Sequence, residues 1–164
     1  MKEPKVALVM GSKSDMEHVK KAEEIMDLFE IRYTKHIYSA HRTPNELKEF
    51  IQNQVNPGSY EVVIAFAGMA AALAGVIASE TVKPVIGVPL SGGKFNGIEA
   101  LLATIEMPPG VPVLTVGIDA AKNAALAATR IIAISDKNVS SALKQYYQDQ
   151  ADAVKFANNE INRK

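Results

Sequence analysis

The chain has 164 residues, 48% of them hydrophobic, and eighteen basic side chains balance eighteen acidic ones. This predicts one compact domain over residues 1–164, and the zero net charge argues against nucleic acid as a partner, so any anion must bind at a local site. No apolar run approaches the roughly 18 residues of a membrane span, and cysteine is absent. We therefore expect a cytoplasmic protein without membrane contacts, disulfides or sulfur-ligated zinc.

Short apolar runs rich in Val and Ile alternate with segments of helical period. Strands are expected at 5–10, 32–38, 61–68, 84–90 and 111–118, and helices at 14–29, 44–54, 69–79, 96–105 and 120–133. Continuous apolar runs are typical of parallel strands covered on both faces, whereas charged and apolar residues alternate through 32–37, which indicates an edge strand. The pattern predicts an α/β, flavodoxin-like three-layer fold with a parallel five-stranded sheet in the order 2-1-3-4-5.

The sequence also predicts a helix at the C-terminus and two helices without a polar face. Residues 135–164 begin with cap-type side chains and continue with apolar residues at near-helical spacing, which predicts an extra C-terminal helix over about 136–160; these residues are Val139, Leu143, Tyr146 and Val154. The segments 69–79 and 120–134 are apolar or alanine-rich on nearly every side. Such helices are usually buried, here against another subunit, although alanine is also simply a good helix former.

The first strand ends in the turn "GSKSD", which opens a helix. Gly11 would allow a tight turn, and the hydroxyls of Ser12 and Ser14 would join free backbone N–H groups at the helix start, where the dipole favours an anion such as phosphate. Ser14 or Asp15 would equally suit a plain helix cap. Both interpretations remain open from this turn alone.

The second strand ends in "SAHRTP", residues 39–44. Ser39 and Arg42 could hold a phosphate, and His41 could carry a proton near neutral pH, or it could be a solvated loop histidine. Thr43 and Pro44 are expected to cap and start the next helix. His18 and His36, within a helix and an edge strand, are interpreted as structural.

Two later loops complete the candidate site. Gly68, at the end of the third strand, would let a ligand approach backbone N–H groups closely, and the glycines of 89–97 suggest a mobile flap carrying Lys94, or a plain connection. In the predicted strand order the loops after the first three strands converge on one crevice, where open α/β sheets bind ligands.

Across nearly the whole chain the sequence resembles the PurE family, which acts on aminoimidazole ribonucleotides in purine biosynthesis. The resemblance is carried by "VMGSKSDM", "SAHRTP", "AGMAAALAG", "PVIGVP" and "IEMPPGVPV" followed by "NAAL". It implies a flavodoxin-like fold, a homo-octamer with sites at subunit junctions, and no metal or organic cofactor. The implied ligands are a small ribonucleotide and CO2.

Matching positions imply roles for individual residues. Ser12, Asp15 and Arg42 match substrate-binding residues of the family, with Ser14 and Ser39 assisting at the phosphate and Asp15 accepting hydrogen bonds from the ribose. His41 matches the acid–base histidine. The resemblance also implies a small apolar CO2 pocket, walled by Gly68, Ala70, Ala71 and Leu73.

The third loop departs from the family. Most bacterial mutases read Gly-Ala-Ala-His-Leu-Pro-Gly there, whereas this chain reads "MAAALAG", with Ala72 at the histidine position. The second class of the family, which carboxylates the ribonucleotide directly, usually shows Arg-Ser-Asn, also absent. "HRTP" and "AGMAA" favour a mutase that converts N5-carboxyaminoimidazole ribonucleotide to 4-carboxy-5-aminoimidazole ribonucleotide. "AAKNAALAATRI" and "SDKNV" resemble the direct carboxylase, which stays the alternative.

A function outside the family is also conceivable for this fold class. A flavodoxin-like domain could bind FMN, but the chain has no Trp and only five Phe and five Tyr, few of them in the candidate loops. A signalling receiver would need an aspartate after the third strand, where "AFAGM" has none. The ribonucleotide enzyme is therefore the favoured interpretation.

Overall fold

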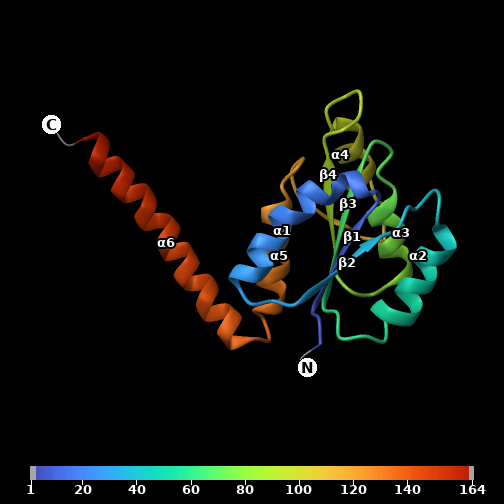
Figure 1. The fold of residues 1–164 in the computed structure, drawn as a ribbon, viewed down its shortest axis with the longest axis horizontal. Coiled ribbons are helices and arrows are strands. Elements are labelled where there is room, and N and C mark those ends of the chain that lie inside the picture. The colour runs from blue at the N-terminus through green and yellow to red at the C-terminus, as the bar shows by residue number, and fades with distance from the viewer. Residues whose placement is uncertain (1–2, 163–164) are drawn as a thin grey trace.

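The computed structural model describes residues 3–162. Its centre is a parallel sheet formed by β1 (Val6–Met10), β2 (Tyr33–Ile37), β3 (Val62–Gly68), β4 (Val85–Leu90) and β5 (Leu114–Thr115). The strand order is β2-β1-β3-β4-β5, with helices on both faces (Figure 1). The predicted flavodoxin-like α/β topology is confirmed.

Two helical layers enclose this sheet. The chain forms a 3₁₀ turn at Lys13–Asp15, a π turn at Ile51–Val55, and the helices α1 (Met16–Leu28), α2 (Pro44–Phe50), α3 (Leu73–Glu80), α4 (Ile98–Ile105), α5 (Ala121–Ile132) and α6 (Lys137–Ile161). Alternate residues of β1 point to opposite faces. Val6, Leu8 and Met10 join the core under α1 and α5, whereas Ala7 and Val9 join the core under α2 and α3. No helix within 3–162 is long and apolar enough to cross a bilayer.

Gly87 in β4 lets two helices sit close to the sheet. A Cβ placed on this residue would lie 2.3 Å from Thr104 Cγ2 of α4 and 3.3 Å from Ala74 Cβ of α3. Real side chains do not approach to 2.3 Å, so any other residue would push α4 outward. Gly87 therefore allows α4 to pack closely on the sheet beside α3, whose first turn borders the candidate site.

The structure shortens two expected elements. Helix α3 begins at Leu73 rather than at 69, because Met69 adopts a left-handed conformation (φ 52°) that ends β3 in a turn instead of starting a helix. Strand β5 covers only Leu114–Thr115 of the expected 111–118. Pro112 lacks an N–H group to donate to the ladder, which accounts for the late start of β5.

The alanines of α5 are buried within the chain itself. Ala121, Ala124, Ala125 and Ala128 are fully buried, where α5 packs against α1 and the sheet. The opposite side exposes Lys122, Asn123 and Arg130. The expectation that this helix is apolar all round is therefore wrong, since its exposed side is polar and its small residues serve close packing inside one chain. Its contact with another subunit stays a prediction.

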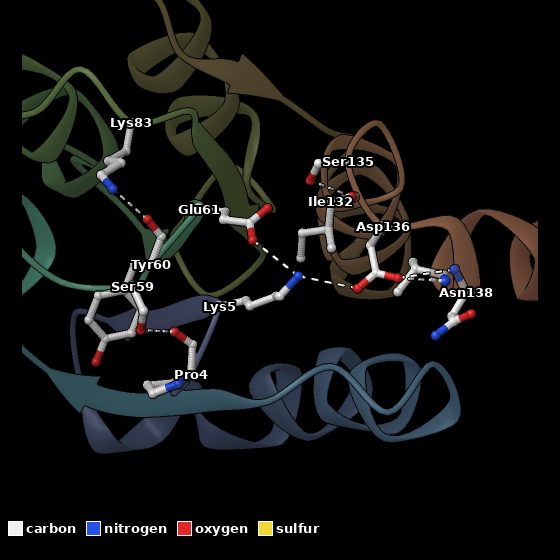
Figure 2. Close-up of polar contacts among 11 residues, drawn as sticks. Pro4, Lys5, Ser59, Tyr60, Glu61, Lys83, Ile132, Ser135, Asp136 and Asn138 are labelled. Atoms are coloured by element: carbon white, nitrogen blue, oxygen red, sulfur yellow. Dashed lines mark hydrogen bonds and ion pairs between the residues drawn. The ribbon is translucent and has the colours of Figure 1, made fainter. Parts of the chain in front are cut away.

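Helix α6 confirms the expected C-terminal helix and extends away from the body of the protein (Figure 1). Its buried residues are Val139 and Leu143, near its start. Asp136 caps the helix by accepting hydrogen bonds from the backbone N–H groups of Asn138 (3.1 Å) and Val139 (3.2 Å). The Lys5 ammonium joins this cap to the sheet, 3.3 Å from Asp136 Oδ2 and 3.1 Å from Glu61 Oε1 (Figure 2).

We predict that Asp136→Asn lowers the melting temperature at pH 7 by a few degrees. The Val139 N–H and the Lys5 ammonium hold the pKa of the Asp136 carboxyl below its ordinary value of 3.8. A lowered folded-state pKa contributes stability above the ordinary value, and this contribution is lost as pH falls through the folded-state pKa. Thermal melts from pH 7 to pH 2 should therefore show the two proteins converging below about pH 4.

The matched control is Asp149→Asn, which removes an exposed carboxylate further along α6. Its melting temperature should follow that of the wild type throughout the pH series. Equal melting temperatures of wild type and Asp136→Asn at pH 7 would show that the cap and the Lys5 contact contribute nothing.

Candidate active site

A cavity of about 670 Å³ opens beyond the carboxyl ends of β1, β2, β3 and β4. Nine of the ten expected site residues line it: Ser12, Ser14, Asp15, Ser39, His41, Arg42, Gly68, Ala70 and Leu73. They come from three separate loops, which confirms that the ends of the first three strands converge as the strand order requires.

In the first loop, helix capping and cavity lining are performed by the same residues. The Ser12 N–H donates to Asp15 Oδ2 (2.9 Å) while Ser12 Oγ accepts from the Ser14 N–H (3.4 Å), which is a reciprocal capping box. The Ser14 hydroxyl donates to Ser12 Oγ (3.0 Å) or Asp15 Oδ1 (3.1 Å). A Cβ on Gly11 would meet only ordinary contacts, so the turn does not require the conformational freedom of glycine.

The second loop is a compact turn stabilised by Ser39 and Thr43. The Ser39 N–H donates to Thr43 Oγ1 (2.9 Å), and Ser39 Oγ accepts from the backbone N–H of Arg42 (3.2 Å) and from its Nε (3.4 Å). Thr43 occupies the N-cap position before Pro44, as expected, but its hydroxyl bonds to Ser39 and does not cap the helix. The turn thus holds Arg42 and His41 on the cavity wall.

His41 and Arg42 are exposed in the single chain. His41 forms no hydrogen bond within residues 3–162, and Arg42 uses only Nε among its side-chain donors. Within the described residues, the terminal guanidinium nitrogens of Arg42 and the imidazole of His41 are therefore available to bind a ligand. Arg42 is the one permanently charged cation among the described residues that line the cavity, and Asp15 is the one carboxylate.

The third loop forms the apolar side of the cavity. Gly68 is tightly placed, because a Cβ there would lie 3.3 Å from the Leu90 carbonyl oxygen of the neighbouring strand. Ala70, Ala72 and Leu73 line the cavity, but Ala71 does not. Ala71 is 2% exposed, because the tight turn that follows Met69 directs it into the protein, so its expected place in the wall is taken by Ala72.

Three polar residues near the site were not expected from the sequence. His18 and Ser91 both line the cavity, and Asp119 connects them. The Asp119 carboxylate accepts hydrogen bonds from the Ser91 N–H (2.9 Å) and hydroxyl, and its Oδ1 lies 3.5 Å from His18 Nδ1. A signal for His18 was present, since it follows Asp15 by three residues and residues at this spacing share one face of a helix.

Lys94 lies outside this cavity. It borders a second, shallower hollow beside the first, together with Met69, Ala70, Gly92, Gly93, Phe95 and Glu99.

In the described part of the chain, no three His, Cys, Asp or Glu residues gather closely enough to hold a metal ion.

The fold and the cavity define an α/β protein whose site, at the switch point of a parallel sheet, combines hydroxyls, a guanidinium and an imidazole with an apolar wall. The family model for AIR carboxylase matches residues 5–153. The chain belongs to this family.

Named relatives and solved structures agree with this assignment. The chain is 47% identical to the N5-carboxyaminoimidazole ribonucleotide mutase of Pyrococcus abyssi, over 89% of this chain and 83% of the relative. It is 41% identical to the mutase of Escherichia coli, over 92% of this chain and 89% of the relative. The crystal structure of Treponema denticola PurE superposes with a TM-score of 0.88 at 28% identity, covering 98% of this chain and 99% of that chain.

Proposed function

We propose that the protein is an N5-carboxyaminoimidazole ribonucleotide mutase acting in the cytoplasm. One observation carries the proposal. His41, from the loop after β2, lines the same cavity as several hydroxyl side chains, Arg42 and an apolar wall, in a chain that is 47% identical to a relative named for this reaction. Each part of the substrate then has a chemically matched partner.

In this proposal the first two loops bind the phosphate and the ribose of the substrate. Arg42 and the hydroxyls of Ser39, Ser12 and Ser14 would hold the phosphate, since a guanidinium and aligned O–H groups form charge-assisted hydrogen bonds with phosphate oxygens. Asp15 would accept hydrogen bonds from the ribose hydroxyls. The capping box holds Asp15 in place, so its carboxylate is oriented before the ligand arrives.

His41 carries the chemistry in this proposal. The bond between the exocyclic nitrogen and its carboxylate breaks, CO2 leaves, and His41 donates a proton to the nitrogen. C4 of the aminoimidazole then attacks CO2 through its enamine-like electron pair, and His41 takes the C4 proton, which restores the aromatic ring and the starting protonation state. Gly68, Ala70, Ala72 and Leu73 would keep the uncharged CO2 close to C4.

Ala72 favours a second candidate function, direct carboxylation of the ribonucleotide. It lines the cavity at the position where most bacterial mutases have a histidine. Direct carboxylation uses only the second half of the mechanism above, in which C4 attacks CO2 and His41 removes the C4 proton. FMN binding is disfavoured, because no Phe, Tyr or Trp is among the described residues that line the cavity.

The deciding experiment supplies the purified protein either with N5-carboxyaminoimidazole ribonucleotide or with aminoimidazole ribonucleotide and bicarbonate at low CO2. Formation of 4-carboxy-5-aminoimidazole ribonucleotide is followed in both. A mutase is expected to be faster with the first substrate. Faster turnover of the second would assign the direct carboxylase, and a yellow purified protein with flavin absorption would overturn both.

A pair of variants should separate chemistry from binding. We expect His41→Asn to lower kcat by about 10²–10⁴-fold, the usual cost of losing a general acid–base, with ribonucleotide affinity largely retained. Arg42→Leu should instead raise KM about 10- to 100-fold, because it removes a charge-assisted phosphate contact. Steady-state kinetics and calorimetric binding measure the two effects.

Either variant can contradict its assignment. His41→Asn with more than a tenth of the wild-type rate, well above what that loss allows, would remove His41 as the proton carrier. An unchanged KM in Arg42→Leu would place the phosphate elsewhere.

We further propose that the chain forms a homo-octamer. Two apolar surfaces support self-association: the outer part of α6, with Val154, Phe156 and Ile161 at 61–83% exposure, and one side of α4, with Ile98, Leu102 and Ile105 about half exposed. A neighbouring subunit would cover such surfaces. Trapping CO2 also requires exclusion of water, whereas His41 and Arg42 are open to solvent in the single chain.

Light scattering at micromolar concentration should therefore give about eight times the 17.7 kDa mass of one chain. Phe156→Glu is expected to shift the protein toward smaller species, because it replaces an exposed apolar side chain of α6 by a charge. The exchange Asp149→Asn on the same helix is the control and should leave the mass unchanged. A monomeric wild type would contradict the proposal.

A further inference from the structure

His18 is a residue of the cavity that the mechanism above leaves without a role. It lies on the first turn of α1, lines the cavity, and has 22% of its side chain exposed. Its Nδ1 is buried without a hydrogen bond and lies 3.5 Å from Asp119 Oδ1, within ion-pair distance. With Nδ1 turned toward Asp119, Nε2 on the other side of the ring is the nitrogen left for a ligand.

Asp119 is held firmly in the position that faces His18. It adopts a left-handed conformation with φ 57°, which is uncommon for a residue other than glycine and is concentrated at functional sites. Ser91 holds the carboxylate through its N–H and its hydroxyl. Although burial opposes ionisation, these hydrogen bonds and the charges of His18 and Lys21 lower the pKa of Asp119. A fixed, ionised carboxylate is an acceptor for an Nδ1–H of the histidine beside it and so orients the imidazole ring.

The charge of the cavity shows what an imidazolium would add. Arg42 and Asp15, the permanently charged side chains among its described lining residues, cancel. The proposed substrate carries a phosphate and a carboxylate, and His41 must exchange its proton during the reaction. Apart from backbone N–H groups, the cavity then has one cation for two anionic groups, and His18 is the remaining side chain that can balance them.

We propose that His18, oriented by Asp119, is a further substrate-binding residue that donates a charge-assisted hydrogen bond from Nε2–H to an anionic oxygen of the ribonucleotide. The identity of the ligand rests on the proposed function. His18 acts from α1, beside the loop after β4, whereas Arg42 acts from the loop after β2. Two side chains from different elements would thus bind the anionic oxygens of the ligand.

The first test measures binding by calorimetry with two probes, aminoimidazole ribonucleotide, which carries only the phosphate, and 4-carboxy-5-aminoimidazole ribonucleotide, which adds the carboxylate. His18→Ala should weaken binding about 10- to 100-fold, the range for loss of a hydrogen bond to a charged group. Weakening with both probes identifies the phosphate as the group that His18 holds. Weakening with the carboxylated probe alone identifies the carboxylate.

The second test asks whether Asp119 acts through His18. Asp119→Asn keeps an acceptor for Ser91 but removes the charge, and should weaken binding less than His18→Ala does. The double variant should bind no more weakly than His18→Ala alone, because the two side chains form one unit. Lys122→Gln, which removes a positive charge from the α5 surface where Lys122 pairs with Glu24, is the control and should bind within twofold of wild type.

A spectroscopic signature complements the affinities. The chain has only three histidines, so His→Gln variants assign the ring ¹⁵N resonances directly. Addition of aminoimidazole ribonucleotide or its carboxylated form should shift the Nε2 resonance of His18, which a purely structural histidine would not show. Should His18→Ala fail to fold, His18→Gln provides the same comparison, since it keeps a donor of similar reach without the charge.

The outcomes separate this inference from the proposed function. Wild-type turnover combined with undiminished probe binding by His18→Ala and His18→Gln overturns the role of His18 and leaves the mutase assignment intact. Probe binding that depends on His18 in a wild type without turnover supports the role of His18 and overturns the assigned reaction. A wild type that binds neither probe overturns both.

Discussion

The parallel alignment of β1 with both β2 and β3 is the constraint on which the candidate site depends. β1 and β2 end at the same level, with Met10 opposite Ile37, and β3 continues from Phe66, the other partner of Met10, to Gly68. Two hydrogen bonds continue the ladder past these ends, from the Tyr38 N–H to the Met10 carbonyl (3.0 Å) and from the Gly11 N–H to the Phe66 carbonyl (3.1 Å). The three following loops therefore start side by side, and their side chains face one cavity.

The stability of this arrangement comes from elsewhere in the protein. All five residues of β1 are fully buried, and the Lys5 contacts to Glu61 and Asp136 lie at the amino ends of the strands, opposite the cavity. The polar side chains of Ser39, His41 and Arg42 are thus carried on a loop by a scaffold that does not need them for its core packing. Such a division lets binding and catalytic residues change without loss of the fold.

Strand order and the convergence of three loops could be predicted because hydrophobic periodicity records which faces are buried. Periodicity does not show which residues from distant parts of the chain contact each other. The contact between His18 and Asp119, 101 positions apart, was therefore not predicted. Ala72 lines the cavity in place of the expected Ala71, and the cause is local. The left-handed Met69 delays the start of α3, and alanine-rich sequence gives no sign of where such a turn occurs.

The hydroxyls of the first loop have a thermodynamic consequence. In the free protein Ser12, Ser14 and Asp15 already satisfy one another, through two backbone N–H donors and through the Ser14 hydroxyl, which donates to Ser12 or to Asp15. An incoming phosphate or ribose must therefore replace some of these bonds, and binding becomes an exchange of partners in which few bonds are added. In the proposed binding mode, such an exchange limits what this loop adds to the affinity for the ribonucleotide.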